Sequence, residues 1–453
     1  MRLLYFGSTD FPQPKARAIQ IVNTCHALAR AGAEVTLAVG RRGHGDVMQG
    51  LAGYGLEPHP NLRILRVPIL RIPSTVPAAV LRQFTRAWQV SYLAGLAAIL
   101  PREVATRRPD VVFARDLRAA RIAARPARAL GAKLVFEVHG LPSYEARHGA
   151  ARSNVAAGEA ARLRALEDGV FGRADRIVTI TECARRILLD EYGVPAERVV
   201  TVADGTTVAA EREPPTEHGA NETAEVGRPG SEAVAAGGAS GAIARQARSP
   251  LLATRGPAAT GRIGGDRSGV PQVFYVGQLY PWKGAGLVVD VAGLVPDARF
   301  VVVGGTPAGP DGDPDVAALA RRIRDAGASE RVELRGYVPY AEVPAQLREA
   351  AVALLPLPDE PVARYFTSPL KLFDYMAAGV PIVASDLPAI REVLRHGENA
   401  LLAAPGDAAA FAGAIRFLLG DPDYARRLGE RARADVRAYS WDRRAAHLLE
   451  LMA

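Results

Sequence analysis

The sequence predicts an α/β protein made of two doubly wound units, each a parallel sheet with helices on both faces. Short apolar runs alternate with helical patterns along residues 1–208 and again along residues 271–438. The apolar runs are nearly continuous, which is typical of strands buried on both faces. The chain has 453 residues, more than one hydrophobic core ordinarily serves, so two domains are expected.

Strands are expected in the first unit wherever a short apolar run is bounded by turn residues or a helical pattern. Helical patterns lie between most of these runs, including Ile19–Ala31 and Asn154–Phe171. The expected strands are Leu3–Phe6, Val35–Val39, Ile64–Val67, Val111–Ala114, Leu134–Val138, Ile177–Ile180 and Val199–Val202.

The second unit repeats the pattern and ends in two helical stretches, Asp423–Ala438 and Trp441–Met452. Residues 209–270 separate the units and are rich in Gly, Ala, Glu and Pro, a composition that predicts a flexible, low-complexity insertion. The expected strands of the second unit are Val273–Val276, Phe300–Val303, Val332–Leu334, Val352–Leu355, Ile382–Ala384 and Leu401–Ala403.

The balance of charge and cysteine limits partners and compartment. A formal net charge of +8 and a pI near 9.6 favour anionic partners such as nucleoside diphosphates or anionic lipid, although an Arg- and Ala-rich composition is an equal explanation. Cys25 and Cys183 form no metal-binding or CxxC spacing, so reduced thiols and a cytoplasmic location are expected. The sequence shows neither a signal peptide nor an apolar run long enough to span a membrane.

The most informative segment is Thr367–Glu392, TSPLKLFDYMAAGVPIVASDLPAIRE. Ser368 and Pro369 fit the cap and first turn of a helix. Lys371 and Asp374 then lie three residues apart, on one face of that helix. A cation and a carboxylate at a helix start suit a ligand that carries both phosphate and hydroxyl groups. The alternative is a plain surface ion pair.

A second loop carries a lysine at the start of a helix. It reads GQLYPWKG over residues 277–284, so Lys283 could meet an anion and Gly284 would allow close backbone approach. The alternative is a solvated lysine in an ordinary turn. Gly304-Gly305, after the strand VVV, forms a sharp turn at the same edge of the sheet. Asp311 and Asp313 lie in a Gly/Pro loop that suggests exposure, and no metal site is expected.

In the first unit, His139 ends the apolar run LVFEVH at the carboxyl edge where such sheets bind ligands. It could donate a hydrogen bond to a sugar hydroxyl or orient an acceptor; a structural histidine is the alternative. Glu137 points the same way and could orient the imidazole. The loop Gly7–Lys15 follows the first strand at the same carboxyl edge, with Gly7 and Lys15 as candidates, and its lack of GxGxxG spacing counts against NAD.

Together these motifs resemble the retaining glycosyltransferases of family 4 (group 1), which have the GT-B fold. The likeness is carried by the loop of residues 277–284, the segment of residues 367–392, Glu137-Val138-His139-Gly140 and Asp204-Gly205. It implies two Rossmann-like domains facing a central cleft: an acceptor-side domain over residues 1–208 and a nucleotide-sugar-binding domain over residues 271–438. It also implies that the last helix, in residues 439–453, crosses back to the first domain.

The resemblance assigns site residues. His139, Lys283 and Asp374 are the implied catalytic residues, and Tyr337 and Val338 match the loop that contacts the base. The implied donor-binding set is Gly7, Gln278, Lys283, Gly304, Tyr337, Val338, Thr367, Ser368, Pro369, Leu370, Lys371 and Asp374.

The chain departs from the family pattern at two places. Gln278 stands where the family commonly has Arg, so Lys371 or Arg364 would have to supply the charge. Phe366 stands where the family often has the first of two glutamates, and Asp374 replaces the second. Thr367, Ser368 or backbone N–H groups would then contact the donor sugar in place of the missing acid.

The expected function is transfer of a hexosyl-like group from a nucleotide sugar to an unknown polysaccharide, glycolipid or small-molecule acceptor, as in cell-envelope polysaccharide biosynthesis. No metal, cofactor or nucleic acid is expected. The alternatives are a binding protein that has lost catalysis, suggested by Gln278 and Phe366, and a nucleotide-sugar epimerase. The basic and aromatic segment Val80–Ala105, with Arg82, Arg86, Trp88 and Tyr92, suggests peripheral contact with the inner face of a membrane; an ordinary packed helix is the alternative.

Overall fold

The computed structural model describes residues 1–13, 15–41, 47–69, 78–148, 157–207 and 269–453, and of residues 41, 78–88, 157 and 158 it describes the backbone. Nearly all of the predicted linker, up to residue 268, lies outside the described residues. The described chain contains two parallel β-sheets, so the predicted α/β fold is confirmed.

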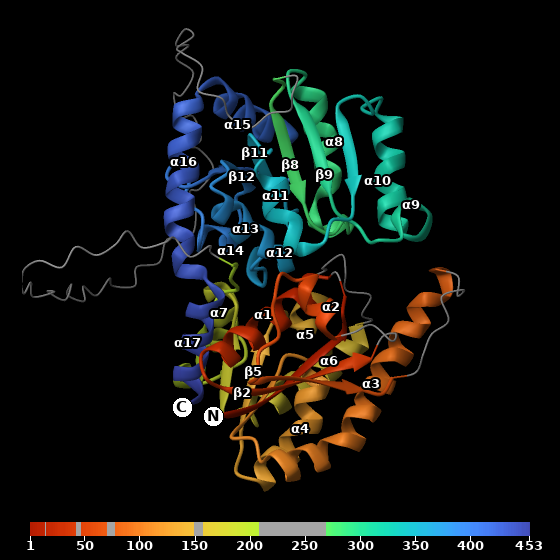
Figure 1. Cartoon of the computed structure of the whole chain (residues 1–453), viewed down its shortest axis with the longest axis vertical. Helices are drawn as coiled ribbons and strands as arrows, with labels where there is room; N and C mark the ends of the chain where they lie inside the picture. The colour runs from red at the N-terminus through yellow and green to blue at the C-terminus, as the bar shows by residue number, and fades with distance from the viewer. Residues whose placement is uncertain (14, 42–46, 70–77, 149–156, 208–268) are drawn as a thin grey trace, which may run out of the picture. The chain divides into compact units, whose positions relative to one another are not determined.

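The first sheet has seven parallel strands in the order β3-β2-β1-β4-β5-β6-β7 (Figure 1). Chain order reverses between β1 and β4, which makes the carboxyl ends of these two strands a favoured place for ligands. Its strands are β1 (Arg2–Phe11), β2 (Glu34–Arg41), β3 (Leu62–Val67), β4 (Val111–Ala114), β5 (Lys133–Val138), β6 (Arg176–Thr179) and β7 (Val199–Thr201). Its helices are α1 (Ala16–Arg30), α2 (Val47–Ala52), α3 (Ala78–Arg107), α4 (Leu117–Ala129), α5 (Pro142–Arg147), α6 (Ala157–Phe171), α7 (Glu182–Asp190) and the 3₁₀ turn η1 (Ala196–Arg198).

The second sheet has six parallel strands in the order β10-β9-β8-β11-β12-β13, with the reversal between β8 and β11. Its strands are β8 (Gln272–Val276), β9 (Arg299–Val303), β10 (Val332–Gly336), β11 (Val352–Leu355), β12 (Ile382–Ser385) and β13 (Leu401–Ala403). Its helices and turns are η2 (Pro281–Lys283), α8 (Ala285–Leu294), α9 (Gly309–Gly312), α10 (Pro314–Asp325), η3 (Tyr340–Glu342), α11 (Val343–Leu347), α12 (Pro361–Tyr365), α13 (Leu370–Ala378), α14 (Pro388–Arg391), α15 (Ala408–Gly420), α16 (Pro422–Asp435), η4 (Val436–Tyr439) and α17 (Trp441–Met452).

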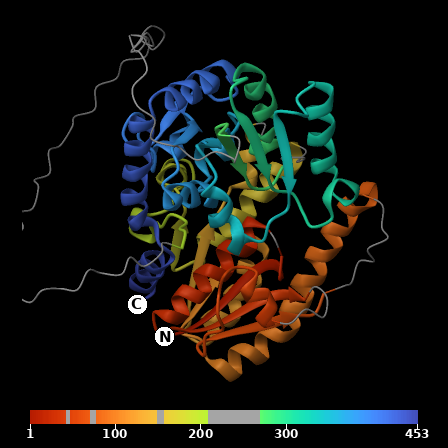
Figure 2. The ribbon, with the colours of Figure 1, turned by 45° about the horizontal axis from the view of Figure 1, so that its top comes forward.

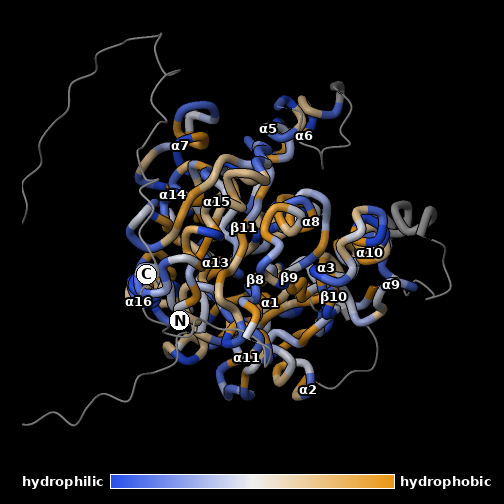
Figure 3. Tube along the Cα trace, turned by 90° about the horizontal axis from the view of Figure 1, so that it is seen from above, coloured by the Kyte–Doolittle hydropathy of each residue, from blue (hydrophilic) through white to orange (hydrophobic). Residues whose placement is uncertain are grey.

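Each sheet is buried on both faces, which explains the continuous apolar runs. Leu4 and Phe6 of β1 pack against α3, α4, α6 and α7, whereas Leu3 and Tyr5 pack against α1 and α17. The second sheet divides its side chains in the same way. One face packs on α8, α10, α15 and α16, and the other on α11, α13 and α14. In Figure 3, helix α10 carries both blue and orange segments, as expected of a helix with one buried and one solvated face.

Every predicted strand is present, but β1 is longer than expected. It runs on through Ser8, Thr9 and Asp10, which are buried, to Phe11. Gly7 therefore lies inside a strand, paired with Val39, and not in a loop. The polar run after Phe6 resembled a loop in sequence, yet after a register shift at Ser8 and Thr9 the strand pairs with β2 again, Asp10 with Gly40 and Phe11 with Arg41.

Side-chain caps and glycine determine several helix ends. Asp116, Thr181 and Asp313 accept backbone N–H bonds at the starts of α4, α7 and α10. Asp313, expected in an exposed loop, is thus a cap. Gly379 ends α13 in the left-handed conformation, with φ +68°, as its sequence predicts.

Two expectations about partners can be compared with the described residues. Tyr92 of α3 is fully buried and its hydroxyl donates to Ala38 O at 3.1 Å, so it belongs to the core and not to a membrane-facing surface. The side chains of Arg82, Arg86 and Trp88 lie outside the described residues. None of the described helices has the length and apolarity that crossing a membrane requires. Cys25 and Cys183 are both free thiols.

The C-terminal helix α17 packs on α1, at the first sheet (Figure 1, Figure 2). Its Arg444 is almost fully buried and donates to the carboxylate of Glu137 at 2.6 Å. The same guanidinium donates to Val202 O and Ala203 O, at the end of β7. Glu137 also accepts from Tyr5 at 3.2 Å and from Gln20 at 3.0 Å. One buried ion pair therefore joins α17 to β1, α1, β5 and the segment after β7.

This ion pair makes a prediction about stability. Replacing Arg444→Met should destabilise the fold by about 3–5 kcal/mol, because the Glu137 carboxylate would stay buried without its cation. The urea midpoint of unfolding measures the loss.

Arg443→Met is the matched control, since Arg443 is the exposed neighbour on the same helix and should change stability by no more than about 0.5 kcal/mol. Adding Glu137→Gln to Arg444→Met should recover part of the loss. Equal midpoints for Arg444→Met and Arg443→Met would show that the pair is unimportant.

Candidate functional site

A cavity of about 460 Å³ is lined by residues from both parallel sheets and their helices. Its walls come from the start of α1, the ends of β4, β5 and β8, and the segment that enters α13. These are carboxyl ends of strands near the two reversals of strand order, where open α/β sheets bind ligands. The predicted residues His139, Gln278, Lys283, Gly304, Tyr337, Val338, Thr367, Ser368, Pro369, Leu370, Lys371 and Asp374 all line it, as does Lys15.

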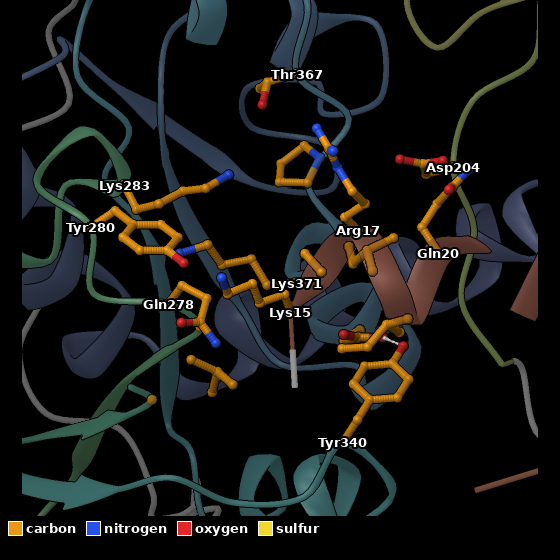
Figure 4. Close-up of a pocket in the computed structure, with 18 of the residues that line it drawn as sticks. Lys15, Arg17, Gln20, Asp204, Gln278, Tyr280, Lys283, Tyr340, Thr367 and Lys371 are labelled. Carbon is orange, nitrogen blue, oxygen red and sulfur yellow. Dashed lines mark hydrogen bonds between the residues drawn. The ribbon is translucent and has the colours of Figure 1, made fainter. Parts of the chain in front are cut away.

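Lysine is rare in this chain and gathers here. Only four of the 56 basic residues are lysines, and three of those four, Lys15, Lys283 and Lys371, line the cavity. In Figure 4 their side chains lie on the same side of the view, together with Gln278 and Tyr280. A lysine ammonium is a compact charge whose pKa shifts readily when buried, so Arg is no equivalent at such a place.

Lys371 has the most unusual environment of the three. Its side chain is buried, and among the described residues its Nζ has no hydrogen-bond partner. The Nζ lies 3.7 Å from the centre of the Tyr275 ring, an attraction that compensates for lost water only in part. Burial, followed by repulsion from Lys283, lowers the pKa of Lys371 well below its ordinary value. A bound anion would oppose both effects, because it stabilises the charged form of the lysine.

Lys283 and Gln278 stand on the loop after β8. The Nζ of Lys283 lies 4.1 Å from the centre of the Trp282 ring, and Trp282 in turn stacks on Tyr280. Gln278 donates its side-chain N–H to Gly305 O at 3.3 Å. The loop thus offers one cation and one amide to the cavity.

Two glycines let this loop approach the rest of the sheet. A Cβ on Gly284 would lie 1.7 Å from Pro356 O, and one on Gly304 would lie 1.8 Å from Gly277 O. Gly284 also has φ +77°, which other residues rarely adopt. The sequence predicted a close backbone approach at Gly284. The group that approaches it is the carbonyl oxygen of Pro356, which follows the neighbouring strand β11.

Asp374, on α13, is held by two hydroxyl groups. Thr206 donates to its Oδ1 at 2.6 Å and Tyr340 donates to the same oxygen at 3.0 Å. Burial raises the pKa of Asp374 to about 6, although both hydroxyl groups oppose the rise. The alternative of a surface ion pair with Lys371 does not hold, because that lysine is turned toward Tyr275.

Ser368 does not cap α13 as predicted. Pro369 occupies the cap position and the helix starts at Leu370, without a side-chain cap. Ser368 Oγ instead accepts the backbone N–H of Asp204 at 3.1 Å. The segment before α13 is thereby tied to the chain that leaves the first sheet.

His139 lies beside Glu137, as its sequence position suggested. Its Nε2 is 2.7 Å from Glu137 Oε1. Burial and the nearby Arg115 lower the pKa of His139 to about 4, against the pull of Glu137. The imidazole is therefore neutral at pH 7, with its proton on Nε2, and Nδ1 is an acceptor. The sequence suggested that His139 donates a hydrogen bond to a sugar hydroxyl. In this arrangement its Nδ1 would instead accept a hydrogen bond from such a hydroxyl.

The structure adds lining residues to which the sequence analysis gave no role in the site. Arg17, Gln20, Arg115, Asp204 and Tyr340 also line the cavity. Asp204 lies 3.8 Å from Arg444, and burial raises its pKa to about 6 although Arg444 opposes this. Arg115 directly follows β4, so its place at a strand end next to the reversal of order was a usable signal.

Three candidates take other positions. Gly7 is inside β1 and is not among the residues that line the cavity. Arg364 pairs with Asp359 and also does not line it, so it is no substitute for the charge absent at Gln278. Phe366 packs edge-on against Tyr144, with ring centres 5.5 Å apart, while bordering the cavity. In the described part of the chain, no three metal-ligating side chains come together.

Comparisons with known proteins agree with this architecture. Two family models match the chain: "Glycosyl transferase 4-like domain" over residues 18–205 and "Glycosyl transferases group 1" over residues 270–421. The D-inositol 3-phosphate glycosyltransferase of Nocardia farcinica is 28% identical over 290 residues, which are 63% of this chain and 53% of that protein. The one of Acidothermus cellulolyticus is 27% identical over 363 residues, 78% of this chain and 69% of that protein. The chain spans about half the length of the first relative.

Solved structures share the fold at low sequence identity. Sucrose-phosphate synthase of Thermosynechococcus elongatus superimposes with a TM-score of 0.70 at 17% identity, covering 100% of this chain and 98% of that one. HepE of Anabaena, solved with UDP-glucose, has a TM-score of 0.62 at 16% identity, with 99% of each chain covered. With the two family matches, these likenesses show that the chain has the GT-B fold and belongs to the group 1 glycosyltransferases of family 4.

Proposed function

We propose that this protein is a retaining glycosyltransferase that moves a sugar from a nucleotide sugar to a hydroxyl group. One observation carries the proposal: the buried ammonium of Lys371 has no hydrogen-bond partner among the described residues and lies near Lys283 in the cavity. Two cations at close range are costly unless an anion joins them. A diphosphate supplies that anion and gains charge as the sugar departs, so cations fixed beforehand favour the transition state.

The remaining residues extend this assignment. Asp374 would bind the ribose hydroxyl groups, and Lys15 and Gln278 would support the phosphates, with Gly304, Tyr337 and Val338 beside the base. Thr367, Ser368, Pro369 and Leu370 would line the sugar and phosphate path. The Anabaena neighbour solved with UDP-glucose favours a uridine donor as the first choice for trials.

The acceptor would enter beside His139. Because Glu137 takes the Nε2 proton, Nδ1 of His139 can accept a hydrogen bond from a sugar or acceptor hydroxyl. No described carboxylate is a clear nucleophile, so same-face transfer assisted by the departing phosphate is the proposed route. The relatives named for D-inositol 3-phosphate make inositol phosphates early acceptor candidates, beside polysaccharide, glycolipid and small-molecule acceptors.

The two alternatives remain open to experiment. A binding protein without catalysis would bind a nucleotide sugar reversibly and would never cleave the sugar from the nucleotide. An epimerase would change the sugar without transferring it. The cytoplasmic location, membrane contact, role in envelope polysaccharides and independence from metal or cofactor stay predictions.

The diphosphate assignment predicts that Lys283→Ala and Lys371→Ala each lower turnover by about 10²–10³-fold, the usual effect of losing one fixed charge at a transition state. Nucleotide release at saturating donor measures it. Lys133→Ala is the control, since Lys133 bonds to Met452 O and Ala453 O outside the cavity. Turnover near that of the parent protein in both cavity variants would refute the assignment.

The pKa of Asp374 predicts how donor affinity depends on pH. Only the ionised carboxylate can accept two ribose hydroxyl groups, and its pKa is raised to about 6. Affinity should therefore be full well above pH 6 and fall about tenfold for each unit below it. Titration of UDP-glucose by calorimetry measures the profile, because the diphosphate of a nucleotide sugar has no group that ionises near pH 6, whereas the terminal phosphate of UDP does. The fall near pH 6 should be absent in Asp374→Asn, and a profile equal to that of the parent protein would count against the assignment.

The metal-free, retaining route is tested by two measurements. Activity should survive excess chelator, because lysines and helix N-termini take the place of a cation. The product should show the anomeric configuration of the donor by NMR. Full loss in chelator, restored by magnesium or manganese, would refute the first part, and an inverted product would refute the second.

A further inference from the structure

We infer that Thr206 and Tyr340 are positioning residues that fix the carboxylate of Asp374 for nucleoside recognition. This rests on the proposed function, and it concerns two residues to which that proposal gives no role. Both hydroxyl groups donate to one oxygen, Oδ1, at 2.6 and 3.0 Å. Among the described residues none donates to the second oxygen, Oδ2, and Asp374 lines the cavity.

The two hydroxyl groups come from different parts of the chain. Tyr340 starts η3, after β10 of the second sheet. Thr206 follows β7 of the first sheet, is 3% exposed, and forms a parallel bridge with Ser440. Two residues earlier, the backbone N–H of Asp204 donates to Ser368 Oγ at 3.1 Å. The short segment Asp204–Thr206 therefore makes two bonds to the donor-binding stretch. One is to Ser368 at its start, and the other is to the carboxylate of Asp374, six residues later.

Each hydroxyl also keeps the carboxylate charged. Burial favours the neutral acid, and both hydroxyl groups oppose burial by donating to the anion. Loss of either hydroxyl would leave Oδ1 less well satisfied and the side chain freer to rotate. The nucleoside would then meet a carboxylate that is less often ionised and less often correctly turned.

The variants Thr206→Val and Tyr340→Phe remove one hydroxyl each and keep the shape of the side chain. Each should weaken binding of UDP by about fivefold, the value of one hydrogen bond to an oriented group. Thr206→Ser keeps the hydroxyl and should bind UDP within about twofold of the parent protein.

The ligand that separates positioning from general damage is 2′,3′-dideoxyuridine diphosphate, which lacks the hydroxyl groups that Asp374 would bind. Its affinity should be the same in the parent protein, Thr206→Val and Tyr340→Phe. Thr179→Val is the matched control, since Thr179 is fully buried, bonds to Thr201 at 3.1 Å and lies away from the cavity. It should lower the melting temperature and leave the affinity for UDP unchanged.

Calorimetry or thermal shift with UDP, ADP, GDP and CDP first establishes which diphosphate the parent protein binds, and the matching dideoxy compound is then used. If it binds none, the proposed function is refuted and this inference with it. If it binds one, the inference is overturned by unchanged affinity in both variants, by an equal loss for the dideoxy compound, or by Thr206→Ser binding as weakly as Thr206→Val.

Discussion

The buried ion pair between Glu137 and Arg444 is the contact on which the rest of the first sheet and the cavity wall at His139 depend. Glu137 has no exposed surface, so its charge is tolerable only because Arg444, Tyr5, Gln20 and His139 all contact it. These partners belong to α17, β1, α1 and the end of β5. The same carboxylate that holds the last helix in place therefore also sets the proton of His139 on Nε2.

The fold was largely predictable because its signal is local. Parallel strands buried on both faces leave continuous apolar runs, and all the predicted runs became strands. The prediction that Gly7 lies in a loop failed because the cause there is not local. Ser8, Thr9 and Asp10 continue β1 although they are polar, because they are buried by other parts of the chain. Local composition cannot show a burial that is created by distant residues.

The candidate site was predictable on its donor side and only in part elsewhere. Lys283, Lys371 and Asp374 lie in short motifs, and the scarcity of lysine in an arginine-rich chain was a further signal. Thr206 and Tyr340 had no role assigned from the sequence, since their importance arises from meeting Asp374 across 168 and 34 residues of sequence. The sequence suggested that Arg364 could supply charge to the cavity. This was wrong because Arg364 forms an ion pair with Asp359, which the sequence alone does not show.

The glycines at 284 and 304 limit how this cavity could diversify. At both positions any side chain would meet a backbone oxygen at under 2 Å, so the turns that follow β8 and β9 are closed to gradual change. Side chains such as Tyr337, Phe366 and Arg115 border the cavity from several elements and meet no such barrier. Evolution toward another ligand would therefore proceed by exchanging the side chains of the cavity wall, while the backbone of these two turns stays as it is.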